Sequence, residues 1–167
     1  MAALALYNAR RHDEAVRCAE RALELQPEYA LGLWILGLAC CGTGDFTRAI
    51  DTLTTLVALT ARAVMFTGTL GLACGLAGRH EEARELLREL QQRRAHQHVG
   101  AAAELFIQVG LRDRDGICSS FDACLAEGVT GFSLEALTNP FLDELATDPR
   151  IAGYMRRLRM VPSRTQD

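Results

Sequence analysis

The chain has 167 residues, of which 49% are hydrophobic and only 6% aromatic, and its formal net charge at pH 7 is −3. This length suffices for one well-buried domain, and the slightly acidic balance gives no basic field for binding nucleic acid. All 18 basic side chains are arginine, so the chain has no lysine for a phosphate loop, a Schiff base or general-base catalysis. Abundant Ala, Leu and Gly with few alternating β-branched runs predict an all-α fold.

Short phrases return along the chain at an interval of 34 residues. Alanine stands at Ala15, Ala49 and Ala83, and the Arg-His-Asp-Glu that precedes Ala15 returns as Arg-His-Glu-Glu before Ala83. The next position in the series is Ile117, where the copy is weakest. A spacing this long and regular indicates that one short unit is copied and stacked along the chain.

The expected elements follow this period in chain order. The first unit has a second helix over residues 13–26, closed by Pro27. The second unit has a first helix over residues 33–40, a Gly-Thr-Gly-Asp turn over residues 42–45 and a second helix over residues 46–59. Although residues 52–60 include several β-branched side chains, they lie in a phase that is helical in the other units, so we expect a helix there.

These features resemble the tetratricopeptide repeat family over residues 1–125, with about three clear repeats and a degenerate fourth. The resemblance implies an all-α, right-handed helical solenoid that offers a binding surface and performs no reaction. We therefore expect no enzymatic activity, no cofactor and no metal site.

Close packing of the paired helices requires small residues where they meet. We expect Ala15, Ala49 and Ala83 to face small residues of the first helices, among them Gly37 and Gly71. Leucines at the same interval, such as Leu53 and Leu56, fill the remaining core positions.

Partner binding is expected on the concave side, which the first helix of each unit lines. This groove is apolar, and it lacks the lysine, arginine and asparagine clamp with which some members of the family grip acidic C-terminal tails, since Asn8 alone matches. An amphipathic helix or an extended apolar segment suits it, from another protein, from a second copy or from the chain's own tail. Some of these residues are candidates for the core instead, but we expect Trp34 and Tyr7 to be exposed to a partner. The predicted groove residues are Leu4, Tyr7, Asn8, Leu31, Trp34, Ile35, Leu38, Cys41, Met65, Thr69, Leu72 and Leu76.

The six cysteines contain no Cys-x-x-Cys pair, so we interpret them as small core residues in a reducing compartment, with Cys41 as the best candidate for a reactive thiol. His12 and His80 precede second helices and are expected to plug the turn. His96 and His98 lie between the third and fourth units, where a solvated junction is expected rather than an anion or metal site.

Residues 126–160 break the period and are expected to cap the array. Asn139 and Asp148 each precede a proline, which predicts helices over about 140–146 and 149–159, and residues 161–167 are expected to be disordered. This ending resembles bacterial tetratricopeptide regions that follow a signalling domain, such as an adenylate cyclase, a winged-helix regulator or a kinase. It implies the sensory arm of such a protein.

The first nine residues lack a basic leader followed by a long apolar core, and no apolar run is long enough to span a membrane, so a cytoplasmic location is expected. The sequence thus predicts a scaffold that binds a protein or peptide. The alternative is a self-association module that forms homodimers.

Overall fold

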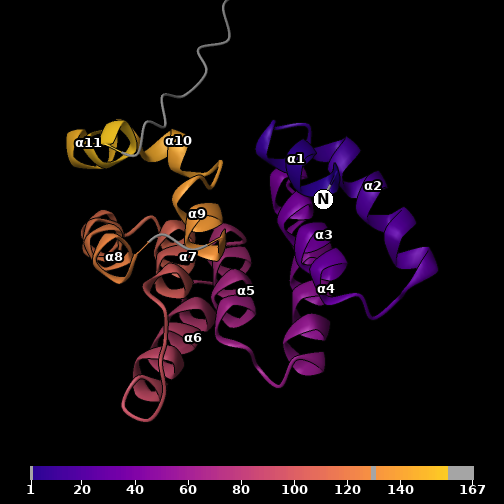
Figure 1. The fold of residues 1–167 in the computed structure, drawn as a ribbon, viewed down its shortest axis with the longest axis horizontal. Coiled ribbons are helices and arrows are strands. Elements are labelled where there is room, and N and C mark those ends of the chain that lie inside the picture. The colour runs from indigo at the N-terminus through magenta and orange to yellow at the C-terminus, as the bar shows by residue number, and fades with distance from the viewer. Residues whose placement is uncertain (1, 129–130, 158–167) are drawn as a thin grey trace, which may run out of the picture.

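The computed structural model describes residues 2–128 and 131–157, and in this part of the chain every regular element is a helix. Eight of the helices form four successive hairpins that stack side by side (Figure 1). The predicted all-α helical solenoid is confirmed. The hairpins pair α1 (Ala2–Asn8) with α2 (His12–Leu25), α3 (Ala30–Thr43) with α4 (Phe46–Leu59), α5 (Val64–Leu76) with α6 (His80–Arg93), and α7 (Ala101–Leu111) with α8 (Arg114–Glu127).

Local sequence sets where the hairpins turn. Gly44 and Gly78, which follow α3 and α5 closely, have φ angles of 80° and 78°, a left-handed conformation that glycine adopts without a Cβ clash. Asp45 then caps α4 by accepting a hydrogen bond from the Arg48 amide, and Asp113 caps α8 in the same way through the Gly116 amide. The predicted second helix of unit two agrees with α4 in both bounds.

The first helices of the hairpins form the centre of the molecule. Helices α3, α5 and α7 are buried along most of their length, whereas α2, α4 and α6 bury one face each and present charged residues outside. Ala15, Ala49 and Ala83 are fully buried, as the repeat predicts. The two glycines expected to face these alanines lie closest to larger side chains: a Cβ on Gly37 would meet Leu53 of α4, and one on Gly71 would meet Ile107 of α7.

Helices α5 and α7 approach until their backbones touch. A Cβ on Gly68 would lie 2.4 Å from the carbonyl oxygen of Ala103, and one on Gly110 would lie 2.5 Å from that of Leu72. Since the obstructing atoms are backbone, glycine is required at these two positions. The glycines therefore hold the third and fourth hairpins together along their first helices.

Three further helices follow the array: α9 (Gly131–Leu137), α10 (Leu142–Leu145) and α11 (Pro149–Arg157). The predicted helices near 140–146 and 149–159 correspond to α10 and α11. The cap predicted at Asp148 is present, but Asn139 does not cap α10, because that helix begins at Leu142 and Phe141 is its N-cap residue. Asn139 Oδ1 accepts a hydrogen bond from the Phe141 amide, and Asp148 Oδ1 accepts one from the Arg150 amide. Helix α9 was not predicted. The expected disorder of residues 161–167 concerns residues outside the described part of the chain.

Residues 2–128 and 131–157 include no helix with both the length and the apolar character that crossing a membrane requires.

Candidate functional site

Most of the predicted groove residues are buried inside the chain. The partly exposed members are Leu4, Asn8, Leu31, Met65 and Leu76. The buried members are Tyr7, Trp34, Ile35, Leu38, Cys41, Thr69 and Leu72. The first helices therefore face an interior over much of their length, and the accessible part of the predicted groove is smaller than the sequence suggested.

Trp34 and Tyr7 were expected to be exposed, and this expectation is wrong: each side chain is 1% exposed. The Trp34 indole Nε1 donates a hydrogen bond of 2.9 Å to Thr69 Oγ1, and its ring lies at a tilt against Phe66. These contacts join α3 to α5. Trp34 thus connects the second hairpin to the third.

The burial of Cys41 argues against the reactive thiol that the sequence suggested there. The thiol is buried beside Cys40 and Cys74, and loss of solvent raises its pKa far above the ordinary range. Burial also raises the pKa of Cys40 and Cys74 to about 11 each. Thiolates are the reactive form, so burial disfavours reaction at these three core cysteines near neutral pH.

The histidines at equivalent repeat positions behave differently. His12 is half-buried and fills the space beside Gly42, where a Cβ would lie 2.4 Å from its ring. Burial, followed by the nearby Arg10, lowers the pKa of His12. His80 is exposed, so its predicted turn-plugging role is wrong. Among the described residues, no three His, Cys, Asp or Glu side chains, His96 and His98 included, gather closely enough to hold a metal ion.

The chain's own C-terminal segment lies against the first helices. Helix α9 packs on α7, and its Glu135 accepts hydrogen bonds of 3.2 and 3.3 Å from Asn8 Nδ2 at the end of α1. Helix α9 therefore links the first helix of the first hairpin, through Asn8, to that of the fourth, on which it packs. Burial raises the pKa of Glu135, and burial followed by charges that include Glu135 raises that of Tyr7.

The turns between the two helices of each hairpin lie along one edge of the array, the turn edge. There Arg10 and Arg112 bind neighbouring carboxylates of α10. Arg10 Nη2 lies 2.5 Å from Asp143 Oδ2, and Arg112 Nη2 lies 2.7 Å from Glu144 Oε2. Because Arg10 follows α1 and Arg112 follows α7, this four-residue helix is held from opposite ends of the array. Sequence reasoning missed both arginines, although the 34-residue period places them at the same position as Gly44 and Gly78.

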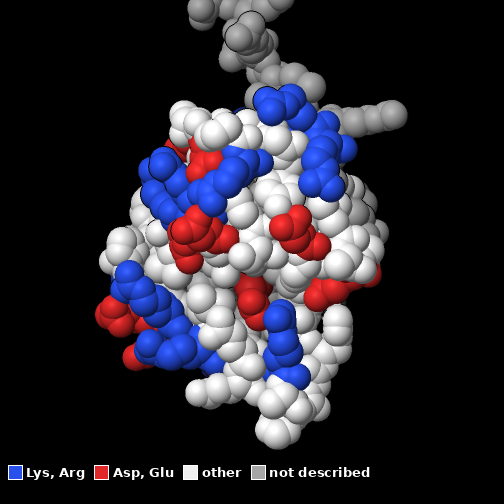
Figure 2. Space-filling model, turned by 90° about the vertical axis from the view of Figure 1, so that its left-hand side faces the viewer, with Lys and Arg blue, Asp and Glu red and all other residues white. Residues whose placement is uncertain are grey.

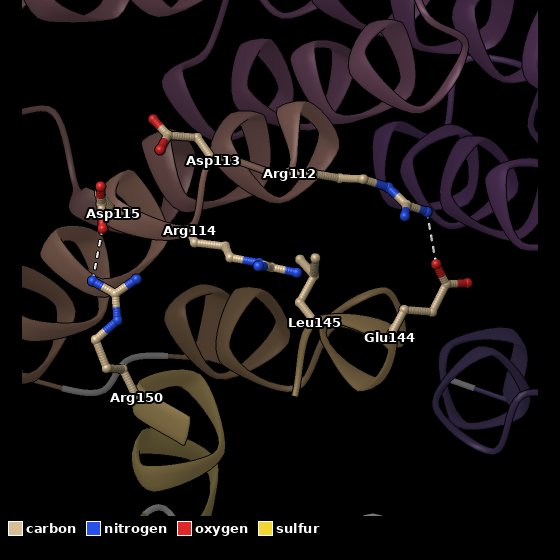
Figure 3. Close-up of a pocket in the computed structure, with 7 residues that line it drawn as sticks. All are labelled: Arg112, Asp113, Arg114, Asp115, Glu144, Leu145 and Arg150. Atoms are coloured by element: carbon tan, nitrogen blue, oxygen red, sulfur yellow. Dashed lines mark hydrogen bonds and ion pairs between the residues drawn. The ribbon is translucent and has the colours of Figure 1, made fainter. Parts of the chain in front are cut away.

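A polar pocket of about 450 Å³ lies where α10 and α11 meet the start of α8. Figure 3 shows its two ion pairs: Arg112 points to Glu144 on one side, and Arg150 points to Asp115 on the other, with Arg114 directed toward Leu145 between them. The Arg150 guanidinium also holds the pKa of Asp148 at about 2. The pocket therefore owes its form to the ion pairs that fix the C-terminal segment to the last hairpin.

Helix α11 is fixed to α8 by an aromatic contact. The rings of Phe121 and Tyr154 stack 5.0 Å apart and nearly parallel, and the Arg157 guanidinium lies 5.6 Å from the centre of the Tyr154 ring. On the side of the molecule where α8 and α11 lie, arginine and acidic side chains are interspersed (Figure 2).

The comparison with known families agrees with this architecture. A family model described as tetratricopeptide repeat matches residues 1–57 and again residues 42–98. Together the two matches span α1 to α6, the first three hairpins, and more than half of the chain. No curated protein matches it. Repeats of this kind generally mediate protein–protein interaction and are typically non-catalytic. The chain belongs to the tetratricopeptide repeat family.

Proposed function

We propose that the chain is a non-enzymatic scaffold that binds a helical or extended apolar segment of another protein on the concave side of its array. The observation that supports this proposal is the docking of α9 against α7 and the end of α1, because α9 is itself a short helix that packs on these first helices. The groove residues that stay partly exposed, among them Leu31 and Met65, supply apolar contact area beside it.

Site-specific photo-crosslinking tests this proposal. A photoreactive phenylalanine analogue at Leu31 or Met65 should yield covalent adducts with a partner in cells. The same analogue at Arg84, an exposed residue on the outer helix α6, should not. Adducts from all three positions alike, or from Arg84 alone, would contradict a binding surface on the concave side.

A second candidate is self-association, which the exposed apolar side chains at the junctions between hairpins favour. Leu25 at the end of α2 is 89% exposed, Leu59 at the end of α4 is 47% exposed, and Tyr29 is 37% exposed. Pairing of two chains through these residues would remove them from water. Light scattering at rising concentration tests it: a dimer that Leu25→Ser abolishes supports self-association, and a monomer at every concentration excludes it.

The same proposal extends to a regulatory arm of a bacterial signalling protein, located in the cytoplasm. Its support is the C-terminal sequence that resembles regions following signalling domains, together with six free cysteines, which a reducing compartment preserves. A fluorescent fusion to the chain would report the compartment. Copurification of the chain with a coexpressed signalling protein that is encoded nearby would support the role as a regulatory arm.

A further inference from the structure

The position after the first helix of each hairpin adopts a left-handed backbone in all four copies. Gly44 and Gly78 occupy it in the second and third hairpins, but Arg10 and Arg112 occupy it in the first and fourth, with φ angles of 60° and 56°. A side chain makes this conformation unfavourable, and such strain persists where surrounding contacts compensate for it. Both arginines form ion pairs with the C-terminal segment, Arg10 with Asp143 and Arg112 with Glu144.

Both arginines are aimed at this segment. Arg10 Nη1 also donates a hydrogen bond of 2.7 Å to the carbonyl oxygen of Asn8, which orients the guanidinium toward Asp143. Asn8 itself bonds Glu135. The turn edge therefore presents two cations and an amide donor to a helical segment that carries three carboxylates, and this complementarity specifies the chemistry of the occupant.

The resident segment satisfies this surface incompletely. The Arg10 and Asp143 side chains are 43% and 34% exposed, and those of Arg112 and Glu144 are 63% and 61% exposed, so both ion pairs are partly screened by water. In addition, Tyr7 Oη and Asn8 Oδ1 are buried with no hydrogen-bond partner among the described residues. An occupant that donates a hydrogen bond to these oxygens would bind beside Tyr7 and Asn8 better than α9 does.

We propose that the edge formed by Asn8, Arg10 and Arg112 is a binding site for an acidic amphipathic helix of a partner protein, which displaces α9 and α10. This inference rests on the proposed function and names its class of partner. The apolar groove alone accepts any apolar segment, whereas this edge selects carboxylates. The exposed ion pairs oppose displacement only weakly. Because α9 and α10 bury Leu137 and Leu142 completely, the partner helix must supply apolar side chains in their place as well as carboxylates.

A labelled synthetic peptide with the sequence of residues 131–157 serves as the probe, and fluorescence anisotropy measures its binding to the full chain. The chain's own segment competes with the probe, so Asp143→Asn with Glu144→Gln in the chain should tighten probe binding by about 2-fold to 30-fold, the range for two exposed ion pairs. When Arg10→Ala and Arg112→Ala are added to this variant, probe binding should weaken by a similar factor, because the probe's carboxylates lose both cations. Alanine retains the left-handed strain and removes only the charge.

Arg84→Ala in the same background is the matched control, because Arg84 pairs with Glu81 on the outer helix, and probe binding should not change. As a test of charge pairing, the chain with Arg10→Glu should bind the wild-type probe more weakly. Its binding should recover with a probe that carries Asp143→Arg. The inference is overturned if Asp143→Asn with Glu144→Gln leaves probe binding unchanged, or if the charge reversal brings no recovery. A wild-type dimer that these two substitutions dissociate would also overturn it, by making a second copy the occupant. If this inference fails, the proposed scaffold function still stands or falls by the separate crosslinking experiment at Leu31 and Met65.

Discussion

The substitution Gly68→Ala tests whether backbone contact between α5 and α7 holds the third and fourth hairpins together. The added Cβ would lie 2.4 Å from Ala103 O and 2.7 Å from Ala103 Cα, whereas ordinary contacts begin at 3.4 Å. The helices must therefore separate by about 1 Å, because no rotamer change moves a backbone carbonyl. Overpacking of this kind costs about 1–3 kcal/mol, and we expect the upper end. The higher helix propensity of alanine returns about 1 kcal/mol, which leaves a net loss of about 2 kcal/mol.

Denaturant unfolding followed by circular dichroism measures this loss, which corresponds to a melting temperature lower by about 4–8 °C for a chain of this size. Gly153→Ala is the matched control: Gly153 lies in α11 with no atom within 4 Å of the place that a Cβ would take, so alanine should stabilise the chain by about 0.5–1 kcal/mol. If Gly68→Ala unfolds at the same denaturant concentration as the wild type, or a higher one, the glycine contact does not hold the helices together.

Three further predictions concern single side chains. Trp34→Phe removes the hydrogen bond to Thr69 and should lower the free energy of unfolding by about 1–3 kcal/mol in the same assay, and an unchanged value would deny Trp34 its fastening role. Burial raises the pKa of Glu135 in the folded state, so its charge opposes folding above that pKa and the protonated form adds stability below the unfolded value. Glu135→Gln should therefore be more stable than the wild type at pH 7, with an advantage that shrinks as the pH falls through the raised pKa; a gap independent of pH would refute this. Cys41 should resist a thiol reagent under native conditions at pH 8 while the half-buried Cys18 reacts, and mass spectrometry of labelled peptides separates the two.

The repeat made much of the array predictable. The 34-residue period defined the hairpins, and α4 has the expected bounds because Asp45 caps it and Gly44 precedes it. The cap at Asp148 followed from local chemistry alone, whereas Asn139 forms a hydrogen-bonded turn before α10 and does not cap it. Helix α9 escaped prediction because its residues carry no capping signal or repeat phase, and its docking depends on contacts with distant residues such as Asn8, which lies 127 positions from Glu135.

The different environments of His12 and His80 show why equivalent positions need not behave alike. His12 packs beside Gly42, thirty residues further on, and the corresponding residue for His80 is Gly110. The space beside Gly110 is taken by the backbone of α5 at Leu72, so no room is left for a ring. The repeat thus predicts which positions correspond, while the spacing between adjacent hairpins decides what each position holds. The predicted groove failed for the same reason, because Trp34 is buried by its contacts with Phe66 and Thr69 of the next hairpin.

The unequal spacing of the hairpins determines how the molecule deforms. Helix α5 makes far more extensive contact with α7 than with α3, and the bond from Trp34 to Thr69 is a local link across the looser junction. We therefore expect bending to concentrate between the second and third hairpins, with the third and fourth moving as one block. The C-terminal segment closes this arc into a loop by tying Arg10 to Asp143, so its release would change the curvature of the whole array as well as uncover a surface.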